Sequence, residues 1–156
     1  MLLFIAVAII VLIIDLVTKA VWVDSFFVLI PGVINIHYIR NFGAAFGMMS
    51  GGVLLLIILT SIIIAVGLLG YFVFRNKSRE QSRGKTFNIA CGMILGGALG
   101  NLYDRVFLGY VRDFLKFDFM EFPIFNFADV FLNIGVGLLI FWMLFMFKGK
   151  NDANQS

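Results

Sequence analysis

Four long apolar stretches, residues 2–22, 53–74, 87–103 and 126–147, constrain the fold of this chain more than any other feature. A helix needs about 20 largely apolar residues to cross the hydrocarbon core of a bilayer. Unpaired backbone N–H and C=O groups are too costly inside lipid, so spanning stretches of this length form helices. The pattern predicts an all-α membrane protein with four transmembrane helices.

The composition agrees with this class of protein. Of the 156 residues, 62% are hydrophobic and only 13% are charged, and the mean hydropathy is +1.03, whereas a soluble domain carries about 25% charged residues. We expect one membrane-embedded domain over residues 1–150 and a cytoplasmic tail at 151–156. No basic region precedes the apolar run at 1–14, so it is predicted to be a retained first helix rather than a removable signal peptide.

The basic residues are concentrated in two hydrophilic segments. Residues 75–85 contain five basic residues and one acid, and the end of the chain adds Lys148 and Lys150 against Asp152. Because cytoplasmic loops are rich in Lys and Arg, both segments and both termini are predicted to be cytoplasmic. The same rule accounts for the pI of about 9.2, so no nucleic-acid partner is expected.

The two remaining connections, residues 23–52 and 104–125, are then expected on the outer side of the membrane. The first combines apolar and β-branched residues with Pro31 and Gly32, and the second is rich in phenylalanine. Such composition favours short strands or a segment lying at the membrane interface. An interfacial aromatic belt explains the aromatic residues, and a lipid-facing platform for a substrate is the more specific interpretation.

Polar residues gather at the predicted outer ends of three helices. They are Asp15, Lys19, Asn101, Asp104, Arg105, Asn126, Asp129 and Asn133. Ionisable residues inside membrane spans are energetically expensive and point to a functional site. The inner halves of the helices are almost purely apolar, so the sequence predicts a single polar site at the outer side.

Helical spacing brings several small and polar residues onto shared faces. Asn126 and Asp129 are three residues apart and lie on the same side of a helix. Gly92, Gly96 and Gly100 recur every four residues in the third stretch. Such a series lets a neighbouring helix approach closely, and we interpret it as packing alone.

Two of the acids have a basic neighbour within reach. Asp15 lies one helical turn before Lys19, and Asp104 directly precedes Arg105. Structural ion pairs are therefore expected at both places.

An ion pair explains Asp113 and Asp129 less well. Asp113 follows Val111 and Arg112 and precedes Phe114, and Asp129 ends the segment FNFAD, so both lie in aromatic surroundings. Partial desolvation raises the pKa of a carboxyl group. If the two carboxylates share a site, one holds a proton while its partner acts as a base, and their titration belongs to the pair. Such a pair meets the requirement for activating a water molecule against a peptide carbonyl.

Other chemistries find less support in the sequence. His37 is the only histidine, which excludes an H-E-x-x-H zinc site. Signatures of P-loop, Rossmann and serine-hydrolase sites are absent. Cys91 lies in an apolar run, where a buried small residue is expected rather than a nucleophile. No cofactor is expected, although a carboxylate-bound Mg²⁺ ion stays an alternative.

Five short segments follow one another along the chain: DLVTK (15–19), RNFGAAFG (40–47), GGALGNLYDR (96–105), VRDF (111–114) and FNFAD (125–129). In this order they resemble the lipoprotein signal peptidases (signal peptidase II), and the resemblance covers residues 11–140. It implies a multi-pass aspartyl protease of the bacterial inner membrane, with an outer-face amphipathic element and a small β-rich cradle.

The resemblance also implies the reaction and its partners. Enzymes of this family remove the signal peptide from prolipoproteins by cutting before the diacylglyceryl-modified cysteine, and the antibiotic globomycin inhibits them. The expected partners are therefore diacylglyceryl-prolipoprotein signal peptides, membrane lipid and globomycin, and the chain is expected to function as a monomer.

The resemblance further assigns roles to individual positions of this chain. The catalytic aspartates of the family correspond to Asp113 and Asp129. Supporting and substrate-binding residues correspond to Asp15, Lys19, Asn41, Gly43, Asn101, Asp104, Arg105, Asn126 and Ala128.

Three other functions are alternatives to a lipoprotein signal peptidase. A small proton-coupled transporter or channel also uses membrane carboxylates, but it needs polar residues through the whole membrane depth. A non-enzymatic lipid-binding module explains the aromatic loops and leaves the aspartates without a purpose. A presenilin-like protease would carry a G-x-G-D motif, which this sequence lacks.

Overall fold

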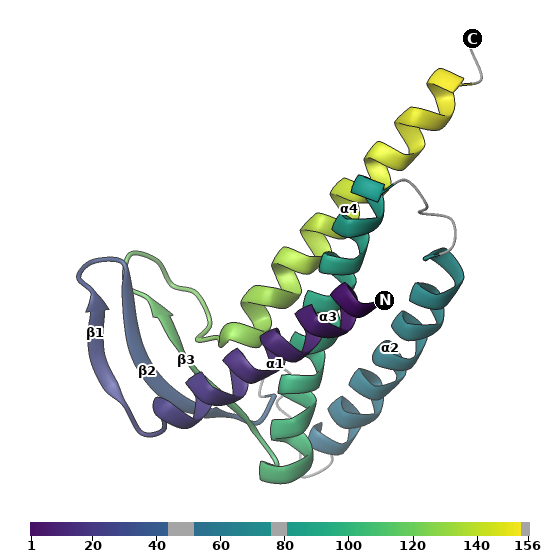
Figure 1. Ribbon diagram of the computed structural model, residues 1–156. Helices are drawn as coiled ribbons and strands as arrows, with labels where there is room; N and C mark the ends of the chain where they lie inside the picture. The colour runs from purple at the N-terminus through teal and green to yellow at the C-terminus, as the bar shows by residue number, and fades with distance from the viewer. Residues whose placement is uncertain (44–51, 76–80, 154–156) are drawn as a thin grey trace.

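The computed structural model describes residues 1–43, 52–75 and 81–153. Its helices are α1 (Leu2–Val21), α2 (Gly52–Phe74), α3 (Gln81–Leu108) and α4 (Phe127–Ala153), and its strands are β1 (Phe26–Ile30), β2 (Ile34–Asn41) and β3 (Val111–Phe117). The strands form one sheet beside the end of the helices where α1 ends and α4 begins (Figure 1). The protein is mostly helical and carries one small sheet. Residues 44–47 of the RNFGAAFG segment lie outside the described residues.

Three of the described helices are long and apolar enough to cross a membrane: Leu2–Val21, Gly52–Phe74 and Phe127–Leu144. The predicted span at 87–103 falls within α3, which is not among them, because glycines and the asparagines Asn88 and Asn101 lower its hydropathy. This helix contacts each of the other three. The structure therefore supports a multi-helix membrane protein, and the count of four spans stays a prediction.

Glycines let α3 approach its neighbours closely. A Cβ atom added at Gly96 would lie 2.6 Å from the backbone oxygen of Ala8 in α1, and one added at Gly97 would lie 2.6 Å from that of Ala128 in α4. Neither distance leaves room for a side chain, so both helices pack directly on the backbone of α3. The packing role predicted for the glycine series is confirmed.

One stripe of α1 faces the inside of the protein. Its buried residues are Phe4, Ala8, Val11, Asp15 and Lys19, which follow the three- and four-residue spacing of a helical face. The first three are apolar and the last two are charged. The stripe thus changes from hydrocarbon packing to an ionic site along the length of the helix.

The sheet has the strand order β1-β2-β3, and both pairs are antiparallel. Pro31 and Gly32 connect the first two strands in a turn closed by the Val33 N–H on the Ile30 carbonyl at 3.0 Å. Gly32 has a φ of +71°, which is the conformation that a type II turn requires after proline. The sheet corresponds to the predicted β-rich cradle, and a separate amphipathic element is not distinguished within the described ranges.

Two hydrophobic clusters hold the fold together, one at each end. The cluster beneath the sheet contains Ile36, Phe114 and Leu115. The cluster at the opposite end joins all four helices through Phe4, Tyr71, Phe87 and Trp142. The polar residues lie next to the first cluster, so the sheet and the site occupy the same end of the protein.

Candidate active site

Asn126 links the two aspartates that the sequence singled out. Its side-chain Nδ2 donates to Asp113 Oδ1 at 2.6 Å, and its backbone N–H donates to Asp129 Oδ2 at 3.1 Å. In return, Asn126 Oδ1 accepts from the backbone N–H of Asp129 at 3.1 Å. Asn126 precedes α4 and caps it, so one residue both starts the helix and contacts both carboxylates.

Asp113 comes to this place on the sheet. It lies opposite Ile39 in the β2–β3 register, and Asn41, two residues further on, donates from Nδ2 to Asp113 Oδ2 at 2.7 Å. The Oδ1 atom of Asn41 accepts from the Gly43 N–H at 2.8 Å. Gly43 has a φ of +78°, a conformation that favours glycine, and this turn fixes the Asn41 amide.

Asn101 of α3 connects the aspartate pair with a buried lysine. Its Nδ2 donates to Asp129 Oδ1 at 2.8 Å, while its Oδ1 accepts from Lys19 Nζ at 2.9 Å and from Asn126 Nδ2 at 3.1 Å. An ammonium group can only donate, so Lys19 fixes the orientation of the amide. The amino group of Asn101 must then face Asp129.

The predicted ion pair of α1 is confirmed. Lys19 Nζ lies 2.7 Å from Asp15 Oδ2, and both side chains are fully buried. Asp15 Oδ1 also accepts the backbone N–H of Ala128 at 3.0 Å. This N–H belongs to the first turn of α4, where a carboxylate is favoured. Asp15 thereby joins α1 to the start of the helix that carries Asp129.

The predicted pairing of Asp104 with Arg105 is wrong. Asp104 lies 3.4 Å from Lys19 Nζ, and it accepts two side-chain hydrogen bonds from Arg112, the shorter at 2.8 Å. The Arg112 backbone N–H adds a third bond at 3.0 Å. Consecutive residues on a helix point about 100° apart, so Arg105 projects elsewhere while β3 brings Arg112 to Asp104.

Arg105 lies close enough to Asp113 and Asp129 for its positive charge to act on both. Burial lowers the pKa of its guanidinium, and the nearby charges of Asp129, Asp113 and Asp104 act in the opposite direction. The guanidinium donates to the Asn101 carbonyl at 3.4 Å. Arg112 was not predicted from the sequence as a site residue. Its position directly before Asp113 was the available signal in the sequence. The contact with Asp104 depends on the path of β3 past the end of α3.

Burial raises the pKa of Asp113 to about 6. The nearby charge of Asp129 raises this pKa further, while the amide donors of Asn41 and Asn126 and the charge of Lys19 lower it. A carboxyl with such a pKa is half protonated at about pH 6, whereas an ordinary aspartate is almost fully ionised there. The environment expected from the aromatic surroundings is therefore present at Asp113.

The charges around the pair balance when it holds one proton. The carboxylates are Asp15, Asp104, Asp113 and Asp129, and the cations are Lys19, Arg105 and Arg112. With both aspartates of the pair ionised, the group has one excess negative charge. A single proton on the pair removes it, and a buried site of low dielectric favours that neutral arrangement.

A cavity of about 440 Å³ opens beside the two aspartates. It is lined by Asn41, Asp113, Phe117, Phe122, Pro123, Ile124, Phe125, Asp129, Val130 and Asn133. One wall is thus polar and the other is aromatic or aliphatic. Asn133, one of the polar residues predicted at the outer ends of the helices, lines the cavity and donates to the Asp129 carbonyl at 2.9 Å.

The described residues contain no group of three or more His, Cys, Asp or Glu side chains arranged to hold a metal ion. Cys91 is a partly buried free cysteine.

Comparison with known proteins bears on this site. A family model described as signal peptidase (SPase) II matches residues 7–145. The chain belongs to the signal peptidase II family. It is a peptidase, as the resemblance of the five segments implied.

Relatives within the signal peptidase II family cover nearly the whole chain. The chain is 44% identical to a lipoprotein signal peptidase of Microcystis aeruginosa, with 86% of each chain covered. It is 41% identical to one of Gloeothece citriformis, with 96% of this chain and 92% of the relative covered.

Two solved structures share the fold. Both are described as bacterial membrane enzymes studied by the in meso method. The first superimposes with a TM-score of 0.78 at 36% identity, covering 90% of this chain and 92% of the other. The second has a TM-score of 0.75 at 35% identity, with 98% and 91% covered.

Proposed function

We propose that this chain removes the signal peptide from diacylglyceryl-modified prolipoproteins, cutting before the lipidated cysteine. The relatives are named lipoprotein signal peptidases, which supports the substrate class. The observation that carries the mechanism is the hydrogen bonding of Asn126 to both Asp113 and Asp129. This arrangement favours two carboxylates acting on one water molecule and one peptide bond.

In the proposed mechanism, ionised Asp129 takes a proton from a water molecule between the two carboxylates. The resulting hydroxide attacks the carbonyl carbon of the scissile bond, and protonated Asp113 donates its proton to the carbonyl oxygen. The product of this step is a neutral gem-diol. The raised pKa of Asp113 supports its assignment as the proton donor.

Collapse of the gem-diol completes the reaction. A gem-diol hydroxyl returns its proton to ionised Asp113, the C–N bond breaks, and the nitrogen receives the proton held by Asp129. The products are a carboxylic acid and an amine, and the pair again holds one proton. No covalent acyl-enzyme is required.

The cavity beside the pair supports the lipid part of the substrate. Its wall of Phe117, Phe122, Phe125 and Val130 is apolar, and the rings of Phe117 and Phe125 are 5.1 Å apart. Burying an acyl chain contributes roughly 0.8 kcal/mol for each CH₂ group. Asn41 and Asn133 lie on the polar wall, where their amides are suited to hydrogen bonds with the peptide backbone.

We further infer four spans in a bacterial inner membrane, with both termini cytoplasmic and the aspartates toward the outer face. The sheet lies beside the end of α1 and the start of α4 (Figure 1), and hydrogen bonds link Asp15, Asp113 and Asp129 to the first residues of α4 and to Asn126 just before it. Arg75, the first of the five basic residues, directly follows α2 and lies beside Met1 at the opposite end. One chain supplies both aspartates, which supports activity as a monomer, and globomycin is expected to inhibit it.

The proton-coupled transporter gains no support from the described residues. Its path would have to pass the cluster of Phe4, Tyr71, Phe87 and Trp142 at the far end of the helices. This cluster is buried and aromatic, and it offers no chain of carboxylates.

A gel-shift assay with a diacylated prolipoprotein tests the proposal directly. Asp113→Asn and Asp129→Asn should each abolish cleavage, while the protein still inserts and folds. Asp118→Asn is the matched control, because Asp118 is an exposed acid bonded to Asn35 at 2.9 Å, away from the pair. Robust cleavage by either dyad variant, or equal cleavage of a substrate without the lipid, would refute the proposal.

A further inference from the structure

A second cavity, of about 180 Å³, lies between α2 and the rest of the helices, at the end remote from the aspartates. Phe4 of α1, Ile63, Gly67 and Tyr71 of α2, and Leu95 of α3 contribute to its lining. Ile63 is 64% exposed, so the cavity opens on the lipid-facing side of α2. The proposed peptidase reaction makes no use of this cavity.

The size and chemistry of the cavity restrict what can occupy it. An apolar cavity of roughly 150 Å³ holds a molecule such as benzene, whereas a helix with side chains is about 10 Å across. The hydroxyl of Tyr71, which lines the cavity, donates to Asn88 Oδ1 at 2.7 Å and is thereby satisfied. A segment of one acyl chain fits these limits, and a peptide helix does not.

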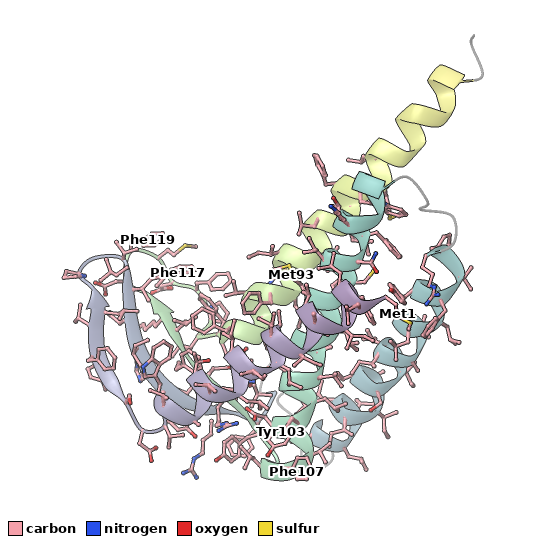
Figure 2. The ribbon with its side chains drawn as sticks, viewed as in Figure 1. Met1, Met93, Tyr103, Phe107, Phe117 and Phe119 are labelled. Atoms are coloured by element: carbon pink, nitrogen blue, oxygen red, sulfur yellow. The ribbon has the colours of Figure 1, made fainter. Side chains whose placement is uncertain are left out.

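A cation lies at one end of this cavity. The rings of Phe4 and Tyr71 stack at 4.0 Å and close that end. Arg75, one turn beyond Tyr71, donates to the Met1 sulfur at 3.3 Å, and its guanidinium lies 5.7 Å from the centre of the Phe72 ring. Met1 lies beside α2 in the side-chain view (Figure 2). Arg75 is also the first of the five basic residues between 75 and 85.

We propose that this cavity holds one acyl chain of an anionic phospholipid whose phosphate pairs with Arg75. The apolar lining and the guanidinium are arranged in the order in which a lipid presents its chain and its headgroup. Basic residues next to a membrane helix attract anionic headgroups. The lipid would fill the space between α2 and α3 and would stabilise the attachment of α2.

Trp142 allows the occupant to be detected. Its ring lies 4.6 Å from Phe87, which lies 5.7 Å from Tyr71 of the cavity wall. The full chain carrying Trp22→Phe retains Trp142 as its single tryptophan. This variant is placed in vesicles of ordinary phosphatidylcholine to which one brominated lipid is added, either phosphatidylglycerol or phosphatidylcholine. The bromine atoms on the acyl chains quench nearby tryptophan.

Brominated phosphatidylglycerol should quench Trp142 more strongly than brominated phosphatidylcholine at the same mole fraction. Arg75→Gln should raise the mole fraction for half-maximal quenching about fivefold, the effect of one lost basic residue near a membrane surface. Gly67→Leu should abolish the excess quenching, because a Cβ at Gly67 meets no atom within 4 Å and the larger side chain fills the cavity.

Gly70→Leu is the matched control. Gly70 lies one turn along α2, also has open space at its Cβ, and does not line the cavity, so the excess quenching should remain. Equal quenching by the two brominated lipids, or an excess that survives Gly67→Leu, would overturn the proposal. Native mass spectrometry provides a second test in protein that keeps both tryptophans. Gly67→Leu should retain less phosphatidylglycerol than Gly70→Leu, and equal retention by the two variants would overturn the proposal.

Discussion

Asn126 and Asp129 are joined by two reciprocal hydrogen bonds across the first turn of α4, each 3.1 Å long. The side chain of each residue accepts the backbone N–H of the other, which is the geometry of a capping box with an aspartate in its third position. The carboxylate proposed as the catalytic base is therefore fixed by the same bonds that begin its helix.

This relationship predicts that capping and catalysis can be separated at Asn126. Asn126→Ser keeps a capping oxygen but loses the amide donor to Asp113, whereas Asn126→Ala loses both. Both variants should cleave about 100-fold more slowly because the pair is misplaced. The alanine variant should in addition be less stable than the serine variant, by ~1 kcal/mol in the free energy of unfolding, because it has lost the cap. Cleavage rates and unfolding in detergent measure the two effects, and a serine variant with full activity would contradict the positioning role.

Lys19 should be required for stability because two buried carboxylates depend on it. Lys19→Met leaves Asp15 without its cation and Asp104 with Arg112 alone. Loss of one partner of a buried ion pair costs about 3–5 kcal/mol. Asp15→Asn combined with Lys19→Met should recover part of that loss, since the neutral amide can still accept the Ala128 N–H. A Lys19→Met protein that unfolds at the wild-type midpoint would contradict the ionic role.

The pKa of Asp113, raised by burial to about 6, predicts an alkaline limit on activity. A protonated donor is lost as the pH rises through this value, so kcat/KM should fall roughly tenfold per pH unit above it. Asn41 donates to the ionised form and lowers the pKa. Asn41→Ala should therefore move the alkaline limb of the pH profile to higher pH.

Asn35→Ala is the control for this shift. Asn35 lies on the same strand and donates to the distant carboxylate of Asp118, so its removal should leave the pH profile unchanged. The limb reports the titration of the aspartate pair as a whole. A limb that moves to lower pH in Asn41→Ala would contradict the assigned hydrogen bond.

Close helix packing predicts opposite effects for two glycine substitutions. Gly96→Ala forces a Cβ to within 2.6 Å of the Ala8 backbone oxygen and 2.7 Å of Val11 Cβ, so it should destabilise the protein by about 1–3 kcal/mol. Gly137→Ala in α4 meets no atom within 4 Å and should be neutral or stabilising by up to about 1 kcal/mol. Thermal unfolding of both variants decides this. Equal stability of the two proteins would refute close packing at Gly96.

The sequence was sufficient for the features that depend on local spacing. Apolar length predicted α1, α2 and α4, and a four-residue separation predicted the Asp15–Lys19 pair. A run of glycines predicted the surface of α3 that faces α1. Each of these features is set within one helix, where position along the chain determines direction in space.

Features that depend on the sheet could not be predicted in the same way. The register of β2 against β3 decides that Asn41 reaches Asp113, and the path of β3 decides that Arg112 rather than Arg105 binds Asp104. Strand register follows from contacts between distant residues and from turn geometry. Hydropathy also does not distinguish α3 as a span, because this helix contacts each of the other three and carries glycines and asparagines.

The sheet that carries Asp113 has a consequence for the maturation of the protein. Asp129 begins a membrane helix, while Asp113 arrives on a strand that pairs with residues more than 70 positions earlier in the chain. In the proposed mechanism neither half hydrolyses a peptide alone, since the second carboxylate is supplied by the other. On that mechanism the newly made chain stays inactive until β2 and β3 have paired and docked.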